Sequence, residues 1–455
     1  MGQSITQLVG AALSKGTLTQ QLSATFLIKV AGAALAIILQ IALARTLAIS
    51  EYGTFVYTLN WVLVLAALAN LGMHLPAVRF IGEYVVGQRH GLLRGFIRRT
   101  TQIVLLGALV IGATYLATLE LLDLPSERRS VMFLSVALIP LFALLNIFKS
   151  FLFAYKQPVN GLVPDQILRQ GLMLLCLGGL WLTGAKVVAF DAMQLTFLTA
   201  AAGLGCALVY LRNASVTVRQ APVEFETRRW ATAGFPFLFV AVAEMTISRT
   251  DILILGAVRP VEEVAVYAAA ALMGASLSMV SATAESVVAP RFAECLARND
   301  KQGLQLLLTR MTRYLSGINF FLGFAMLALG DFILGMFGKG FVGGYPALLV
   351  LVINYLFFAL VGPVGTLMGI SGNQRPYAIG MAIAGALNIV VTYALVSRYG
   401  AVGAALGRLF VTVLLGAGFG YLVWHRLGIM PTIVGPWLIQ LRKPATVDRS
   451  GTPGG

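Results

Sequence analysis

The chain has 455 residues, of which 58% are hydrophobic and 11% are charged, and its formal net charge is +15. A soluble domain carries about 25% charged residues, so this composition excludes a soluble protein and indicates a polytopic helical membrane protein. Lys and Arg concentrate in the cytoplasmic loops of such proteins, so the positive charge does not indicate nucleic-acid binding.

Hydropathy predicts about twelve membrane-spanning helices, each close to the roughly 20 residues that cross a bilayer. The predicted limits are 22–44, 53–75, 101–121, 130–152, 164–184, 192–211, 233–256, 265–288, 314–335, 346–369, 377–397 and 402–424. The predicted fold class is therefore an all-α polytopic membrane protein.

The basic residues predict the orientation of these spans. With the N-terminus inside, 22 of the 33 Lys and Arg fall in cytoplasmic segments, 7 in outside segments and 4 within spans. The positive-inside rule then places both termini in the cytoplasm. Residues 1–20 lack the basic region, short apolar core and cleavage site of a signal peptide, so we expect the first span to act as an uncleaved signal.

An internal repeat with an offset of 212 residues relates the two halves of the chain. The matching pairs are Ala77/Ala289, Arg79/Arg291, Phe80/Phe292, Gly91/Gly303, Leu92/Leu304, Arg98/Arg310 and Glu51/Glu263. The same offset superposes residues 22–44 on 234–256 without a gap. Because six spans separate equivalent positions, the sequence predicts two six-helix lobes with the same orientation, related by a pseudo-twofold axis, around a central cavity.

The repeat also predicts the domain limits. Residues 1–211 form the N-terminal lobe, 212–230 a cytoplasmic linker, 231–424 the C-terminal lobe and 425–455 a cytoplasmic tail. Transporters built from two such lobes bind their substrate between them and work by rocking one lobe against the other.

The span 233–256 is unusual because it carries Glu244, Arg249 and Asp251. At about 100° per residue, Glu244, Ser248 and Asp251 form one polar stripe, and Arg249 points elsewhere. Ionisable groups in hydrocarbon cost at least about 2.5 to 3.5 kcal/mol each unless they face a partner or water. We therefore expect this helix to line a wet space, although Arg249 and Asp251 could equally snorkel outward or pair with neighbouring helices.

Polar residues on the first two helices of each half are candidates for the cavity wall: Lys29, Gln40, Asn60, His74, Glu244, Arg249, Asp251 and Glu285. Lys29 is close enough to the cytoplasmic end to snorkel instead. Arg408 follows a run of small residues that favours close helix packing, and is a further candidate. Asp165 and Arg169 are spaced i, i+4, which favours a simple salt bridge along the helix.

Enzyme motifs are missing from the sequence. It contains no P-loop, no G-x-S-x-G and no H-E-x-x-H, and its three His and three Cys are too scattered to indicate a metal site. The predicted outer loops are short, which disfavours a membrane-embedded glycan polymerase or ligase. The sequence therefore predicts neither an enzyme nor a cofactor or metal site.

Three segments resemble bacterial oligosaccharide flippases. Residues 43–57 read LARTLAISEYGTFVY and resemble their first outer loop, and residues 249–267 read RTDILILGAVRPVEEVAVY and resemble their seventh helix and the following turn. Residues 371–407, with SGN at 371–373 and YGAVGAA at 399–405, resemble the region from the tenth span to the twelfth. The chain thus resembles the polysaccharide transport branch, of the O-antigen flippase type, of the multidrug, oligosaccharidyl-lipid and polysaccharide exporter superfamily.

The resemblance implies a flippase that moves an undecaprenyl-pyrophosphate-linked oligosaccharide to the outer leaflet of the bacterial inner membrane by alternating access. The product would serve synthesis of O-antigen for lipopolysaccharide, capsule or exopolysaccharide. The implied partners are the lipid-linked oligosaccharide and membrane lipid, with a polysaccharide polymerase and a chain-length regulator, and no nucleic acid. The assigned residues are Lys29, Arg249, Arg408 and Asn60 for substrate, and Glu244, Asp251 and Glu285 for a coupling cation or proton.

One alternative stays open, a cation-coupled multidrug exporter of the same superfamily. An acidic stripe suits organic cations, so an exporter should tolerate loss of Arg249 better than loss of Glu244. A flippase of anionic lipid should show the reverse.

Overall fold

The structure is a computed structural model of the whole chain. It describes residues 18–123, 125–215, 221–298, 300–371, 374–430 and 432, and these residues form helices and the turns that join them, with no β-strand among them. The predicted tail, 425–455, lies largely outside the described residues, as does 216–220 of the predicted linker.

The N-terminal half contains nine helices along the described chain. They are α2 (Leu18–Thr46), α3 (Ile49–Ala69), α4 (His74–Val86), α5 (His90–Leu121), α6 (Ser126–Ser135), α7 (Leu138–Ala154), α8 (Pro158–Leu162), α9 (Gln170–Leu182) and α10 (Ala189–Ala214). A π-helix, η1 (Val163–Arg169), joins α8 to α9.

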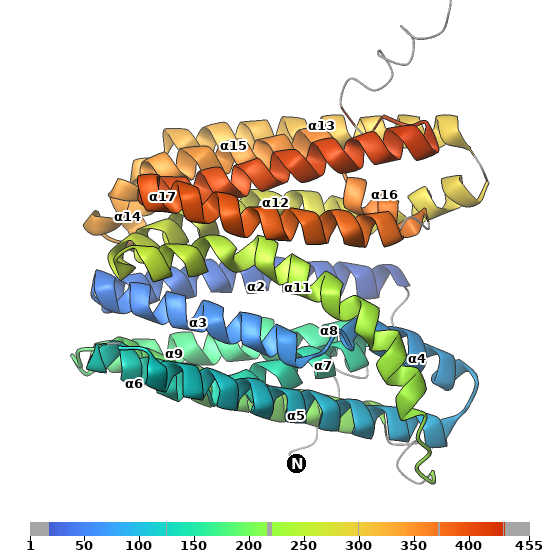
Figure 1. Cartoon of the computed structure of the whole chain (residues 1–455), viewed down its shortest axis with the longest axis horizontal. Coiled ribbons are helices and arrows are strands. Elements are labelled where there is room, and N and C mark those ends of the chain that lie inside the picture. Colours follow the sequence, from blue (N-terminus) through green and yellow to red (C-terminus); the bar gives the residue numbers. More distant parts are fainter. Residues whose placement is uncertain are drawn as a thin grey trace, which may run out of the picture.

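The described part of the C-terminal half is likewise helical. It comprises α11 (Thr227–Val258), α12 (Val261–Ala297), α13 (Lys301–Ala328), α14 (Gly330–Phe337), the short 3₁₀-helix η3 (Lys339–Gly344), α15 (Tyr345–Val361), α16 (Val364–Ile370) and α17 (Gln374–Leu427). The two halves lie as two adjacent bundles, with α11 running obliquely from one toward the other (Figure 1).

The helix limits repeat at the offset seen in the sequence. α2 and α11 end at Thr46 and Val258, and α3 and α12 begin at Ile49 and Val261. One side-chain contact repeats as well: Glu51 Oε2 accepts a hydrogen bond from the backbone N–H of Ala189 at 2.6 Å, and Glu263 Oε2 accepts one from Ala401 at 3.1 Å. Both pairs are 212 residues apart, so the same carboxylate holds the start of the same helix in each half.

α17 contains two of the predicted spans. Its 54 residues are more than twice the length that one crossing needs, and Gly400 interrupts it with φ 55° and ψ −130°. Its two parts pack side by side, because a Cβ placed on Gly407 would lie 2.4 Å from Thr392 Oγ1. The small residues before Arg408 therefore serve close helix packing, as the sequence indicated.

The structure adds helical segments beyond the predicted spans, α4 and the first turns of α5. α4 and the first turns of α5 are amphipathic rather than apolar, so hydropathy alone places them in a loop. Phe96 packs edge-on against Trp230 at the start of α11, and Phe80 packs against Phe96. Trp230 Nε1 also donates to Tyr84 Oη at 2.9 Å. Trp230 is fully buried, so the beginning of the second half is anchored in the first.

The two halves also meet at the opposite end of the molecule. A Cβ on Gly53 would lie 1.9 Å from the carbonyl oxygen of Val261, and one on Gly256 would lie 2.1 Å from the Tyr57 ring. Arg45 donates to the carbonyl oxygens of Gly335 and Met336 at 2.9 and 2.6 Å. Because Gly53 and Gly256 carry no side chain, the two halves approach each other closely at this seam. The predicted orientation places the seam on the outer side of the membrane.

By length and composition, eight described helices can cross a membrane, and the pair α13 and α14, bent by 67°, would add a ninth. This test does not count three of the predicted spans: 164–184, 233–256 on α11 and one of the two on α17. Gly400 divides α17, and η1 breaks the run from Pro158 to Leu182. The number of twelve crossings stays a prediction.

Candidate functional site: a basic cavity between the two halves

A cavity of about 410 Å³ lies between the two halves of the molecule. The first half contributes α2, α3 and the η1–α9 junction to its wall, and the second half contributes α11, α12, α15 and α17. Its polar lining consists of Gln40, Tyr52, Asn60, Arg169, Gln170, Ser248, Arg249, Tyr355 and Arg408. This lining includes three arginines and no carboxylate, so the cavity offers donors to an anion.

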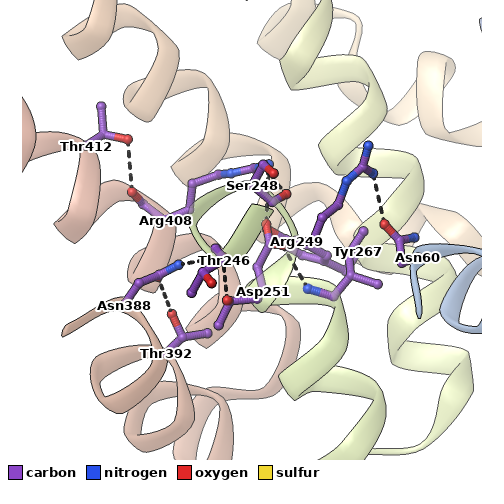
Figure 2. A network of polar contacts seen from close by, with 12 residues as sticks. Asn60, Thr246, Ser248, Arg249, Asp251, Tyr267, Asn388, Thr392, Arg408 and Thr412 are labelled. Carbon is purple, nitrogen blue, oxygen red and sulfur yellow. Dashed lines mark hydrogen bonds and ion pairs between the residues drawn. The ribbon is translucent and has the colours of Figure 1, made fainter. Parts of the chain in front are cut away.

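Arg408 reaches the cavity from α17 and is held in place by Asp251 of α11. Arg408 Nη1 lies 3.3 Å from Asp251 Oδ2, and Arg408 Nη2 donates to the carbonyl oxygen of Ser248 at 3.1 Å. Tyr267 of α12 donates its hydroxyl to the same Asp251 oxygen at 2.6 Å (Figure 2). Asp251 is therefore a buried link between three helices rather than part of the cavity wall.

Arg249 spans the gap between the two halves. Its Nη1 donates to Asn60 Oδ1 on α3 at 2.9 Å, and Asn60 in turn donates to the carbonyl oxygen of Val56 at 2.8 Å. Within the part of the chain that the structure describes, Arg249 has no carboxylate at salt-bridge distance, and its buried Nε has no hydrogen-bond partner. Figure 2 shows it directed away from Arg408 and toward Asn60. Of the three arginines in this wall, Arg249 is thus the one without a carboxylate partner among the described residues.

The third arginine, Arg169, ends the π-helix η1. Pro164 lacks a backbone N–H, and the wider π turn that follows it carries Arg169 to the cavity wall. Arg169 Nε also donates to Asp165 Oδ1 at 2.8 Å, so the salt bridge expected from the i, i+4 spacing is present. Sequence reasoning stopped at that bridge and missed the cavity position. Pro164, within an apolar run, was the sequence feature that could have indicated this irregular turn.

The other predicted residues lie elsewhere. Lys29 is exposed on α2 and is not part of the cavity lining, and Glu244 is exposed on α11. Glu285 on α12 is half-buried, and one of its carboxylate oxygens accepts a hydrogen bond from Thr366 Oγ1 at 2.9 Å. The structure therefore brings together Asn60, Arg249 and Arg408 and leaves Lys29, Glu244 and Glu285 apart from them.

The polar stripe on α11 divides accordingly. Ser248 lies in the cavity wall beside Arg249, although helical geometry alone placed them on different faces. Asp251 faces neighbouring helices, and Glu244 does not reach this cavity. Among the described residues, no group of three or more His, Cys, Asp or Glu is arranged to hold a metal ion.

The fold is similar to several solved transporters. The inward-facing form of a multidrug resistance MATE family transporter of the MOP superfamily matches with a TM-score of 0.65 and 14% identity, covering 89% of this chain and 95% of that one. The lipid II flippase MurJ in an inward closed conformation matches with a TM-score of 0.67 and 12% identity, covering 87% of each chain. At such identities the likeness shows the fold alone.

A third similar structure is a MOP superfamily transporter from Pyrococcus furiosus, whose description speaks of a reversed polarity of the binding pocket. It matches with a TM-score of 0.60 and 12% identity, covering 91% of this chain and 97% of that one. No curated protein matches the chain. The polysaccharide biosynthesis protein family, however, matches residues 18–296, which is more than half of the sequence. The chain is therefore a membrane protein with the MOP transporter fold that belongs to the polysaccharide biosynthesis protein family.

Proposed function

We propose that the chain is a flippase for an undecaprenyl-pyrophosphate-linked oligosaccharide, working by alternating access in surface polysaccharide synthesis. The observation that carries the proposal is the cavity lining, in which arginines from both halves face a shared space without a carboxylate. A pyrophosphate cannot cross hydrocarbon unaided, because burying its charge without partners is prohibitive. Arginine replaces its hydration with charge-assisted, frequently bidentate hydrogen bonds.

Arg249 makes a hydrogen bond that substrate binding would change. A phosphate oxygen at Arg249 would take the place of Asn60 Oδ1. The hydrogen bond between Asn60 on α3 and Arg249 on α11 is a contact between the two halves. Substrate binding would thus exchange a contact between the lobes for a contact with the head group. A cavity of about 410 Å³ lies in the range of small-ligand pockets, so the remaining sugars need the halves to separate.

We assign ion coupling to the second half. Glu244 and Glu285 both lie within electrostatic range of Tyr377 on α17, away from the arginines. Asp251 is already engaged by Arg408 and Tyr267, so we assign it to positioning Arg408 rather than to coupling. The acidic groups on α11 therefore do not oppose an anionic substrate in the cavity.

The proposed setting is the bacterial inner membrane, with both termini in the cytoplasm. A polysaccharide polymerase and a chain-length regulator are the proposed partners, and O-antigen, capsule or exopolysaccharide the product. A multidrug exporter of organic cations is disfavoured, because the described lining presents cations and no acid to such a substrate.

The test is complementation of a bacterial strain that lacks its own O-unit flippase, read as restored surface polysaccharide. Wild type, Arg249→Ala, Arg249→Lys and Glu244→Gln are compared at matched membrane levels, with Arg310→Ala as a control because Arg310 is exposed outside the cavity. We expect restoration by wild type and Arg310→Ala, loss with Arg249→Ala and partial activity with Arg249→Lys. No restoration by wild type, together with dye resistance that depends on Glu244, would establish the exporter instead.

A further inference from the structure

A second hollow lies on the first half, separate from the cavity between the lobes. α3, α5 and α6 enclose about 440 Å³ with a mostly apolar and aromatic wall. α3 turns Tyr57, Trp61 and Leu65 toward it, whereas other residues of the same helix, such as Asn60, line the central cavity. Arg128 is the single charged residue in this lining, which contains no carboxylate.

The length of this groove matches one leaflet of a bilayer. Along α5 and its C-terminal cap residue it runs from Ile111 to Leu122. At about 1.5 Å per residue this is roughly 16 Å, which is about half of a hydrocarbon core about 30 Å thick. Arg128 lies in the first turn of α6, the next helix along the chain, beyond the C-terminal end of α5. One end of the groove is thus cationic and the rest is apolar.

Arg128 is only partly satisfied by the protein. Its guanidinium lies 4.5 Å from the centre of the Tyr57 ring, and Nη2 donates to the carbonyl oxygen of Gly256 at 3.0 Å. Its Nε is buried and has no hydrogen-bond partner among the described residues. Arg128 therefore keeps donor capacity that its contacts with Tyr57 and Gly256 do not use.

We propose that this groove binds an anionic phospholipid, with an acyl chain between α3 and α5 and the head-group phosphate on Arg128. The apolar length fits a chain of one leaflet, and the lone cation fits a phosphate. Gly256 belongs to the second half, so a phosphate at Arg128 competes with one contact between the halves. Lipid binding there loosens the seam at this end of the molecule.

The experiment is native mass spectrometry of the full-length protein titrated with phosphatidylglycerol, with phosphatidylcholine of the same acyl chains, or with undecaprenyl phosphate. Thr114→Trp fills the groove from an exposed position in its wall, and Arg128→Gln removes its charge. Val110→Trp is the matched control, because Val110 lies one turn away on α5, is 65% exposed and does not line the groove. We expect wild type to retain phosphatidylglycerol preferentially, and both groove variants to lower this retention at least fivefold.

Three outcomes would overturn the proposal. Thr114→Trp and Val110→Trp retaining phosphatidylglycerol equally would show that the groove is not the binding site. Equal retention of both lipids, unchanged by Arg128→Gln, would show that no anionic head group is recognised. If undecaprenyl phosphate is the only lipid whose retention Thr114→Trp lowers, the groove holds an isoprenoid chain rather than a phospholipid.

Discussion

The two halves share their supporting contacts and differ in their cavity residues. Glu51 and Glu263 hold equivalent helix starts with equivalent hydrogen bonds. At the same offset of 212, however, the equivalents of Arg249, Asp251, Arg408 and Asn60 are Ile37, Leu39, Thr196 and Leu272. Contacts that support the fold occur in both halves because both halves have the same fold. The molecule has one cavity between the halves, so its charged residues need not occur in both. The symmetric residues therefore report the fold, and the asymmetric ones report the site.

Replacing the Asp251 carboxylate with the residue of the other half tests whether it positions Arg408. Asp251→Leu leaves a buried cation without its partner, and we expect it to lower the free energy of unfolding by about 3 to 5 kcal/mol. Asp251→Leu with Arg408→Thr converts both positions to their first-half equivalents and should recover most of that loss, while transport stays absent. Thermal unfolding of the purified protein measures the first effect and complementation the second. A double variant no more stable than Asp251→Leu would contradict the pairing.

Arg249→Ile likewise replaces a cavity residue with its equivalent from the first half, at the arginine that has no carboxylate partner among the described residues. A hydrogen bond to a charged group contributes about 1.5 to 3 kcal/mol, so we expect the rate of flipping in proteoliposomes to fall by roughly tenfold to 150-fold. Because Arg249 has no carboxylate partner in the described chain, its loss should leave the unfolding midpoint nearly unchanged. A rate equal to that of wild type would remove Arg249 from the site.

The shared contacts give a prediction of equal effects. Glu51→Gln and Glu263→Gln each weaken one charged hydrogen bond to a helix start, and we expect each to destabilise the protein by about 1 to 2 kcal/mol. Gly53 and Val261, which contact each other, lie two residues from Glu51 and Glu263, so the double variant measures the coupling between the two sites. Thermal melts in one detergent measure all three variants. A large effect at one site and none at the other would break the structural symmetry of the halves.

Asn60→Leu has the smallest expected effect. It removes the acceptor that Arg249 Nη1 contacts, a hydrogen bond that a bound phosphate would replace under the proposed function. We expect the dissociation constant for undecaprenyl pyrophosphate to fall a few-fold, measured by binding to the protein in nanodiscs. Weaker binding would instead mean that Asn60 contacts the head group directly.

Much of this architecture could be predicted from local patterns. Apolar length located the helices, and the offset of 212 located the repeat, because both depend on residues near one another in the chain or on a fixed spacing. The charged span on α11 was likewise visible as a source of cavity residues. The amphipathic ends of α4 and α5 were not visible, because hydropathy does not separate a half-buried helix from a loop.

The partners of the charged residues could not be predicted in this way. Arg249 meets Asn60 across 189 residues of sequence, and Arg408 meets the carbonyl of Ser248 across 160. Helical periodicity assigns a face to each residue but not the neighbour that faces it. The coupling role of Asp251 stays a prediction, and the structure adds that this residue binds Arg408 and Tyr267. Arg169 was interpreted only as part of a salt bridge, and it also reaches the cavity.

The amino-acid sequence by itself determined that the chain is a two-part helical membrane protein, because apolar length and repeat spacing are properties of the chain alone. Only the tertiary structure decided which charges face one another. A basic cavity lies where helices from both halves converge. Asp251 is not part of its wall and instead contacts Arg408 and Tyr267. The physical reason is that a buried charge is stable only beside its partner or water, and tertiary packing supplies that partner.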